Sequence, residues 1–537
     1  MTTFRPPDAP ADAPADAPAD APADAPAEAP PSAGGVFGLL HAWDGLRARP
    51  GYRVAGVIVG LGLAAGVLAL PAPAGLTPEA QRAGAMTVTM AAWWLGGVLP
   101  MAVTALLPLV ALPLLGVSST REAAAPYADP LIFLMLGGMI LAHAMEEVGL
   151  HRRLVAVLLA PEWVRRSPRR IALALMTAAA CVSAFINNTS SMLMMLPIAL
   201  LLAEGAGGGR RTRAAFTLST AYACSIGGVA TLVGTAPNAV FAGLAASIAG
   251  REIRFLDWML VGVPFVALAI PLAWFVVNFV ALPVPVASSR VPPAPVAPPW
   301  SEGERSVLVV FGLCFLAWLT RAPVDLGFAR VPGWASLLSV KVDDGFVAIL
   351  ASMCLFLLPR RTARSGGGHD DDGDDGNFLL SWRRAARAIP WSALLLLGGG
   401  YAMAEAIQSS GLSAWMAGGT SALAALPGPL AAFGICVSVA FLSAFTSNTA
   451  TTQIALPLLG AGALAAGVNP LVWMIPATIS ASCDFTLAVG TPPNAIAAEA
   501  GDIAPADMAF AGVILNVACA VLAAGVALVI APWVFGV

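Results

Sequence analysis

The chain has 537 residues, of which 58% are hydrophobic and 11% charged. Soluble proteins carry about 25% charged residues, so a water-soluble globule is excluded and an all-α integral membrane protein is predicted. The 28 basic and 31 acidic residues nearly balance, which leaves no basic surface for nucleic acid. The sequence contains no nucleophile–base set, CxxC pair or HExxH motif, so we predict that the protein is not an enzyme.

Residues 1–35 repeat the tetrad Ala-Pro-Ala-Asp, and we predict that this tail is disordered. Proline at every fourth position prevents a helix, and the segment lacks the apolar surface that would compensate the entropy of ordering it. The tail has neither the basic start nor the apolar run of a signal peptide.

Eleven segments are predicted to be transmembrane helices, because a span needs roughly 20 predominantly apolar residues. They are residues 54–73, 84–98, 99–117, 130–149, 214–247, 256–283, 305–320, 344–358, 391–409, 470–498 and 508–534. A Pro-rich linker at residues 284–304 divides the series.

Two further apolar segments, residues 171–203 and 430–462, are predicted to be re-entrant hairpins. Each has 33 residues, and as one straight helix each would be about 50 Å long. That length exceeds the hydrocarbon core of about 30 Å. Each segment also carries a polar cluster at its middle, which would form the tip of a hairpin that enters and leaves on the same side.

The distribution of basic residues supports this map, because basic residues concentrate on the cytoplasmic side of membrane proteins. With the N-terminus in the cytoplasm, 21 of the 28 basic residues lie inside and 7 outside. A single crossing by residues 171–203 would instead place the cluster at 210–213 outside. The map predicts a multi-pass protein of the bacterial inner membrane whose C-terminus lies outside.

Three motifs occur twice in the same order, which indicates two homologous halves. Ser-Ala-Phe-Ile-Asn-Asn-Thr at 183–189 recurs as Ser-Ala-Phe-Thr-Ser-Asn-Thr at 443–449, an offset of 260. Gly-Thr-Ala-Pro-Asn at 234–238 recurs as Gly-Thr-Pro-Pro-Asn at 490–494, an offset of 256. The Gly-Gly pair at Gly137 recurs at Gly399, an offset of 262.

The first half, residues 54–283, comprises an extra first helix and the first repeat, and the second repeat spans residues 305–534. Each repeat has a hairpin (171–203 or 430–462) followed by a broken helix (214–247 or 470–498). An odd number of spans separates equivalent motifs, so the repeats are predicted to have inverted topology. Inverted repeats are typical of secondary transporters, whose substrate site lies at the midplane between the repeats.

The repeated Gly-Thr-x-Pro-Asn motif is predicted to break its helix inside the membrane. Proline lacks an N–H and clashes with the preceding turn, while glycine loosens the backbone. Irregular backbone at membrane depth is tolerated where it lines a cavity or is buried in protein. The freed carbonyls and the Ser, Thr and Asn oxygens form a neutral oxygen site suited to Na⁺. Helix N-termini and amides can bind a carboxylate without a basic residue.

The hairpin tips and the following helix breaks together resemble the divalent anion–sodium symporter family, the sodium-coupled dicarboxylate and sulfate transporters. The resemblance covers nearly all of residues 54–534. It implies an elevator-type homodimer with scaffold helices at the dimer interface and a moving transport domain built on the hairpins. It also implies interfacial amphipathic helices, which residues 150–168 and 412–427 could supply.

The resemblance also implies two or more sodium sites and a substrate site between them. The sodium ligands correspond to Ser183, Asn187, Asn188 and Gly234 in the first repeat and to Ser443, Thr446, Asn448 and Gly490 in the second. The substrate residues correspond to Asn188, Thr189, Thr235, Asn448, Thr449, Thr491 and Pro492. The family's first tip reads Ser-Asn-Thr where this chain has Asn187-Asn188-Thr189, which leaves the stoichiometry or affinity of the first sodium site open.

Asp484 is a candidate cation or proton site, because intramembrane acids are usually functional and the equivalent residue of the first repeat is Gly228. The leading hypothesis is a sodium-driven symporter for small dianions, with succinate, malate and fumarate as the expected C4-dicarboxylates. The open alternatives are symport of sulfate or a tricarboxylate, dicarboxylate exchange without sodium, and a proton/sodium antiporter of related topology.

Overall fold

The computed structural model describes residues 49, 51–207, 209–285, 299–325, 330–338, 340–359, 378–416, 423 and 425–536. Contacts within the chain define two units, Met1–Tyr52 and Arg53–Val537, and nearly all described residues belong to the second. The tail predicted at residues 1–35 and most of the linker predicted at 284–304 lie outside the described residues.

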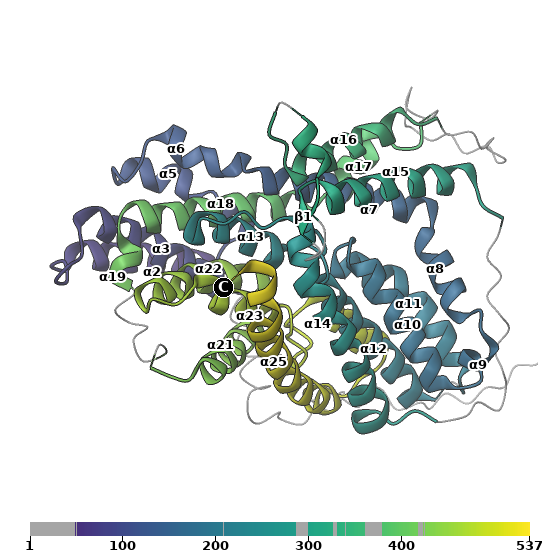
Figure 1. Ribbon diagram of the computed structural model, residues 1–537. Coiled ribbons are helices and arrows are strands. Elements are labelled where there is room, and N and C mark those ends of the chain that lie inside the picture. Colours follow the sequence, from purple (N-terminus) through teal and green to yellow (C-terminus); the bar gives the residue numbers. More distant parts are fainter. Residues whose placement is uncertain are drawn as a thin grey trace, which may run out of the picture. The chain divides into compact units, whose positions relative to one another are not determined.

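The regular structure of the described residues is helical apart from one small antiparallel ribbon (Figure 1) and an isolated bridge between Pro359 and Phe378. The ribbon pairs β1 (Val324–Asp325) with β2 (Arg330–Val331), with Val324 opposite Val331. The helices before the linker are α2 (Tyr52–Ala69), α3 (Pro78–Gly96), α4 (Met101–Thr104), α5 (Leu107–Leu114), α6 (Thr120–Ala124), a 3₁₀ turn (Ala125–Ala128), α7 (Pro130–Val148), α8 (Leu150–Leu159), α9 (Glu162–Arg165), α10 (Pro168–Ser183), α11 (Asn188–Gly205), α12 (Arg210–Gly228), α13 (Ala236–Ala249), α14 (Phe255–Phe275) and a π-helical turn (Val276–Ala281).

The helices after the linker continue to the C-terminal end of the described chain. They are α15 (Glu302–Thr320), a 3₁₀ turn (Trp334–Leu337), α16 (Asp344–Leu357), α17 (Trp382–Ala388), α18 (Trp391–Ser409), α19 (Leu412–Met416), α21 (Gly428–Ser443), α22 (Asn448–Ala465), α23 (Pro470–Ala481), α24 (Pro492–Ala500) and α25 (Pro505–Phe535). Of the interfacial helices expected at 150–168 and 412–427, the first region forms α8 and α9, whereas residues 417–422 and 424 lie outside the described residues.

Five helical stretches of the described chain are long and apolar enough to cross a membrane. They are Tyr52–Ala69, Thr120–Val148, Phe255–Ala281, Glu302–Thr320 and Pro505–Phe535. Several other helices are apolar but shorter, and the segment predicted as one span at 99–117 is divided into α4 and α5. The fold is therefore that of a helical membrane protein, while the count of eleven spans stays a prediction.

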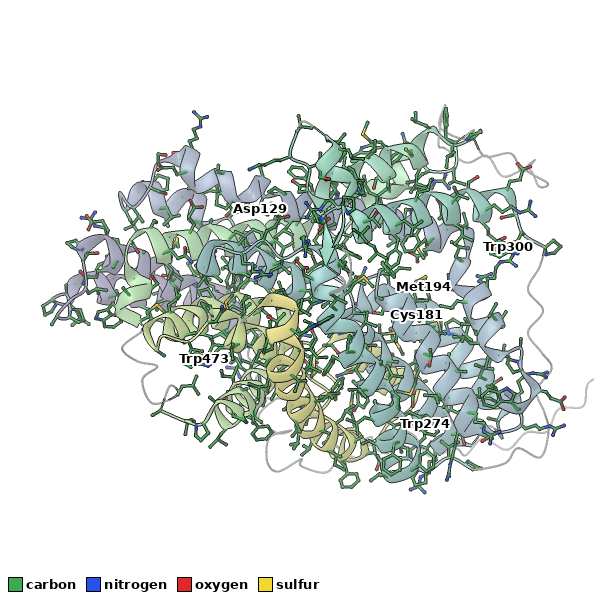
Figure 2. The ribbon with its side chains drawn as sticks, viewed as in Figure 1. Asp129, Cys181, Met194, Trp274, Trp300 and Trp473 are labelled. Carbon is green, nitrogen blue, oxygen red and sulfur yellow. The ribbon has the colours of Figure 1, made fainter. Side chains whose placement is uncertain are left out.

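The two predicted hairpins have the same dimensions. Helices α10 and α21 have 16 residues each, and α11 and α22 have 18 each. The residue after the first helix, Ala184 or Ala444, has φ −61° and ψ −22° in both. A 16-residue helix is about 24 Å long, which is shorter than a hydrocarbon core of about 30 Å. Cys181 on α10 and Met194 on α11 mark the first pair in Figure 2.

The predicted broken helices are each two separate helices joined by an irregular segment. The first is divided into α12 and α13, and the second into α23 and α24. Proline occupies the second position of α13 (Pro237) and the first two positions of α24 (Pro492 and Pro493), where a missing N–H costs no helical hydrogen bond. Thr235 and Thr491, which precede these helices, are both extended, with φ −146° and −134°.

The broken helices interleave between the halves. Helix α13 packs against α22 and α23 of the second half, and α24 packs against α11 and α12 of the first. Every residue of α12 from Ala214 to Gly228 is buried, whereas Gly60 is the one buried residue of α2. The centre of the second unit is therefore formed by the broken helices, and α2 offers an apolar surface suited to lipid or another subunit.

A second set of contacts between the halves occurs at the repeated Gly-Gly pair. A Cβ atom on Gly137 of α7 would lie 2.6 Å from the backbone of Ala348 on α16. A Cβ atom on Gly399 of α18 would lie 2.2 Å from the carbonyl oxygen of Ala105, between α4 and α5. In both repeats the glycine thus permits a close approach to a helical segment of the other half.

Two ion-pair clusters, around Arg153 and Arg321, join segments that connect the helices. Arg153 of α8 binds the carboxylate of Glu304 on α15 with both ends of its guanidinium, at 2.8 to 3.1 Å. Its guanidinium also stacks on Trp300, 3.9 Å from the ring centre, at the start of α15 (Figure 2). Arg321 bridges Asp344 at 2.6 Å and Glu252 at 2.7 Å. These contacts tie α8 and the segment before α14 to α15 and α16.

Candidate functional site

The tip of the first hairpin is fixed to the first broken helix through Ser183. Its hydroxyl contacts two acceptors, the side-chain oxygen of Asn188 at 2.9 Å and the carbonyl of Cys224 on α12 at 2.7 Å. Ser183 is fully buried. Asn188 is the first residue of α11, so this contact orients its amide beside the end of α12.

Oxygen atoms converge around two glycines at the first helix break. A Cβ atom on Gly228 would lie 2.5 Å from the Asn188 amide oxygen and 3.3 Å from the Gly234 carbonyl. A Cβ atom on Gly234 would lie 2.5 Å from the Gly228 carbonyl and 2.8 Å from the Ala184 carbonyl. The two glycines therefore allow four neutral oxygens to approach one another closely, a cluster that we call the cradle. Neutral oxygens of this kind suit a monovalent cation.

The second hairpin repeats the first contact at its own broken helix. The Ser443 hydroxyl lies 2.9 Å from the Asn448 amide oxygen and 2.7 Å from the carbonyl of Ala481, the last residue of α23. A Cβ atom on Gly490 would lie 3.4 Å from the Ala444 carbonyl. Equivalent positions of the two halves therefore carry the same groups: a serine hydroxyl, an asparagine amide oxygen and backbone carbonyls.

The second break differs from the first in length and charge. Helix α23 ends at Ala481, whose equivalent at an offset of 256 is Ser225, whereas α12 continues to Gly228. The equivalent of Gly228 is Asp484, which is 1% exposed. A Cβ atom on Gly490 would lie 2.6 Å from one oxygen of its carboxylate. The Asp484 side chain is therefore directed toward Gly490, which is the equivalent of Gly234 in the first break.

Asparagines at the end of each Gly-Thr-x-Pro-Asn motif hold the irregular backbone. The Asn238 amide nitrogen binds the carbonyls of Gly228 at 2.9 Å and Thr231 at 2.7 Å. The Asn494 amide nitrogen binds the carbonyls of Asp484 at 2.9 Å and Leu487 at 3.2 Å. These amides replace the helical hydrogen bonds lost at the break, so the freed carbonyls keep fixed positions.

Neighbouring helices enclose the breaks through residues that the sequence motifs do not include. The Tyr222 hydroxyl of α12 donates to the Phe485 carbonyl at 2.7 Å, and Asn516 of α25 accepts from the Phe485 N–H at 3.0 Å. The Trp258 indole of α14 donates to the Val229 carbonyl at 2.8 Å. No repeat or motif marks these three residues, so the sequence offered no signal for them.

The predicted substrate residues gather at the starts of helices. Thr189 and Thr449 lie in the first turns of α11 and α22 and are half-buried. Thr235 precedes α13 and Thr491 precedes α24, and neither threonine side chain caps its helix. The Thr491 hydroxyl is buried and has no hydrogen-bond partner among the described residues. Pro492, the first residue of α24, is exposed.

Two predicted sodium ligands use their side chains for other contacts. The Asn187 amide oxygen accepts from the Ser190 N–H at 2.9 Å and caps α11, and its side chain is exposed. The Thr446 hydroxyl donates to the Leu442 carbonyl at 2.9 Å, one turn earlier. Neither side chain is among the three atoms that a Cβ would meet most closely at Gly228, Gly234 or Gly490.

The arrangement is chemically suited to ions held by neutral dipoles. The tips at 183–189 and 443–449 and the breaks at 228–238 and 482–494 contain no Arg, Lys or His. The starts of α13 and α22 have no side-chain cap, so free N–H groups there can bind an anion, whereas the two prolines that begin α24 have no N–H. Within the described residues, no group of three or more His, Cys, Asp or Glu side chains could hold a transition metal.

Known proteins with similar sequences are transporters. The family model described as "Citrate transporter" matches residues 90–478. The "Sodium-dependent dicarboxylate transporter SdcS" of Staphylococcus saprophyticus is 32% identical over 501 residues, covering 90% of this chain and 92% of that protein. The protein of the same name from Staphylococcus aureus is 32% identical over 469 residues, covering 84% and 86%.

A similar fold is found among solved structures. The YdaH transporter of Alcanivorax borkumensis, whose crystal structure is described as revealing an unusual topology, matches with a TM-score of 0.50. The match covers 78% of this chain and 89% of that chain at 15% sequence identity. At this level of identity the comparison supports the fold of a helical membrane transporter and carries no information on the substrate.

Proposed function

The chain belongs to the divalent anion–sodium symporter family, and from this premise we propose that it couples the transport of small dianions to sodium. The protein is a transporter and not an enzyme. The observation that carries the proposal is that in each half a hairpin serine contacts both the asparagine amide of its own hairpin and a carbonyl of the following broken helix. Two such clusters, one in each half, provide two places for a cation beside a shared substrate site.

The proposed substrates are C4-dicarboxylates such as succinate, malate and fumarate. Two relatives of this chain are named sodium-dependent dicarboxylate transporters. With no basic residue in the tips or breaks, amides, hydroxyls and helix N-termini must bind the carboxylates, and bound sodium ions must offset their charge. The residues assigned to the substrate are Asn188, Thr189, Thr235, Asn448, Thr449, Thr491 and Pro492.

The first sodium site is assigned to the cradle at Gly228 and Gly234. Its oxygens are the Asn188 amide and the carbonyls of Ala184, Gly228 and Gly234, with Ser183 orienting the amide. Hard cations bind such carbonyl and amide oxygens. The exposed Asn187 caps a helix, so its predicted role as a ligand receives no support from its position.

The second sodium site is assigned to the equivalent region between Asn448 and Gly490. Ser443 orients the Asn448 amide in the same way, and Gly490 lies near the Ala444 carbonyl. The Thr446 hydroxyl donates its proton to the Leu442 carbonyl, which leaves its oxygen able to face an ion. Two or more sodium ions per dianion follow from this assignment.

We further propose that transport proceeds by an elevator motion in a homodimer, with the N-terminus in the cytoplasm and the C-terminus outside. The equal dimensions of the two hairpins and the exchange of α13 and α24 between the halves support two inverted repeats. The ion pairs of Arg153 and Arg321 supply fixed points for connecting segments during such a motion.

Citrate is a second candidate substrate, because the matching family model is described as a citrate transporter. Citrate, like malate, presents carboxylates and a hydroxyl that amides and helix N-termini can bind. Sulfate symport, sodium-independent exchange and proton/sodium antiport stay open alternatives.

A binding experiment on purified protein tests the proposal. Thermal stability is measured with succinate, citrate or sulfate, in sodium and in choline chloride. We expect succinate to raise the melting temperature in sodium and to have little effect in choline, because the dianion needs bound cations. Stabilisation by succinate of equal size in both salts would contradict sodium coupling, and stabilisation by citrate alone would change the substrate.

A further inference from the structure

Asp484 is a buried carboxylate that has no acidic equivalent in the first repeat, where Gly228 occupies its position. It is 1% exposed, and neither side-chain oxygen has a hydrogen-bond partner or an ion pair among the described residues. A buried carboxylate without a partner is strongly unfavourable, and proteins keep one where it pairs with a cation or binds a metal ion. In its ionised form the side chain therefore requires a partner that the described protein atoms do not provide.

The local backbone makes room for this carboxylate beside the second cation site. In the first repeat, a side chain at the equivalent Gly228 would collide with the Asn188 amide oxygen at 2.5 Å. In the second repeat α23 ends at Ala481, so residue 484 is no longer helical. Its carboxylate lies next to Gly490 instead, and the Ala444 carbonyl approaches the same glycine.

The second break and the last turn of α23 contain further unsatisfied oxygens. The hydroxyls of Ser480, Ser482 and Thr491 and the amide oxygen of Asn494 are buried and have no hydrogen-bond partner among the described residues. With both oxygens of Asp484 they make six such atoms, compared with the Ser225 hydroxyl and the Asn238 amide oxygen around the first break. Oxygens without hydrogen-bond donors are suited to a hard cation.

We propose that Asp484 is a carboxylate ligand of the second cation site. The two sodium sites are then unequal: the first is a neutral cradle of amide and carbonyl oxygens, and the second is anionic. The anionic site binds sodium more tightly and fills first, before the dianion arrives. This inference rests on the proposed sodium coupling and assigns a residue and an order of binding to it.

Sodium binding to the purified full-length protein tests the inference without a transport assay. Equilibrium dialysis with radioactive sodium, in choline chloride and without any dianion, measures affinity and stoichiometry. Asp484→Asn keeps the size of the side chain, and Asp484→Gly makes the second break match the first. Asp507→Asn on α25 is the control, because it removes one half-buried acidic charge at the start of that helix, outside the breaks.

We expect the wild type and Asp507→Asn to bind one sodium ion tightly and further sodium weakly. Because ligand charge tunes cation affinity, both Asp484 variants should bind the tight ion at least about tenfold more weakly. Tight binding within twofold of the wild type in both Asp484 variants would overturn the inference while leaving sodium coupling intact. Absence of saturable sodium binding in the wild type, even with succinate, would instead overturn the proposed function itself. Unchanged melting temperatures in choline show that the variants are folded.

Discussion

The hydroxyl of Ser443 donates a hydrogen bond of 2.9 Å to the amide oxygen of Asn448, across the turn of the second hairpin. Ser183 and Asn188 make the same contact at the same distance in the first hairpin. Each serine hydroxyl also approaches a carbonyl at the end of a broken helix, within 2.7 Å. The orientation of both asparagine amides is therefore coupled to the irregular backbone that follows in the sequence.

Asn188→Ala and Asn448→Ala should each reduce dianion uptake to background while leaving the protein folded. Each change removes an amide assigned to both sodium and substrate. Uptake of labelled succinate into proteoliposomes measures the effect, and size-exclusion chromatography in detergent checks folding. Transport at wild-type level by either variant would refute the assignment of that asparagine.

Asn187→Ala is the matched control at the neighbouring position. The side chain caps α11 and is exposed, so its loss should cost about 1 kcal/mol of stability and leave uptake largely intact. Loss of uptake equal to that of Asn188→Ala would show that Asn187 is a ligand after all, and that the cradle around Gly228 is wrongly assigned.

Ser183→Ala and Ser443→Ala should weaken sodium binding without removing a side chain that is assigned to substrate binding. Without the hydroxyl the neighbouring amide loses its fixed orientation, at a cost of about 1 kcal/mol. The sodium concentration for half-maximal uptake should rise several-fold in both variants, whereas the maximal rate at saturating sodium changes little. An unchanged sodium dependence in both variants would mean that the serines serve only packing.

Tyr222→Phe should loosen the second break. The hydroxyl donates to the Phe485 carbonyl from the other half of the chain, and its removal leaves a buried acceptor with one donor fewer, at about 1–3 kcal/mol. The variant should melt at a lower temperature, and sodium should restore less of the loss than in the wild type. A melting temperature equal to that of the wild type would show that this contact adds no stability.

Asp344→Asn should destabilise the fold far more than Glu252→Gln, although both acids pair with Arg321. Asp344 and Arg321 are 6% and 9% exposed at their side chains, whereas Glu252 is 67% exposed. Breaking a buried pair costs about 3–5 kcal/mol, and an exposed pair contributes at most about 1 kcal/mol. Thermal melting of the two variants checks the order, and similar melting temperatures would contradict it.

Much of the fold could be predicted from the sequence where side-chain chemistry determines the backbone. Proline and glycine at 234–238 and 490–494 predicted the helix breaks, and prolines do stand at the starts of α13 and α24. The polar centres of 171–203 and 430–462 coincide with the turns after Ser183 and Ser443.

Other features had no signal in the sequence. The carbonyls of Ala184 and Gly228 carry no residue-specific signature, so their approach to Gly234 emerged only with the folded backbone. The repeat suggested equal breaks, but α23 ends three residues earlier than α12 in equivalent numbering. The role of Asn187 was inferred from its motif, and its position as a helix cap depends on the tip conformation.

The central claim is that an inward sodium gradient drives accumulation of a dicarboxylate, and flux into proteoliposomes tests it most directly. Purified protein is reconstituted, and uptake of labelled succinate is measured with sodium outside, with equal sodium on both sides, and with choline replacing sodium. The account predicts transient accumulation above the external concentration only under the inward gradient, and none in choline. Succinate uptake of equal rate and extent in choline would contradict it.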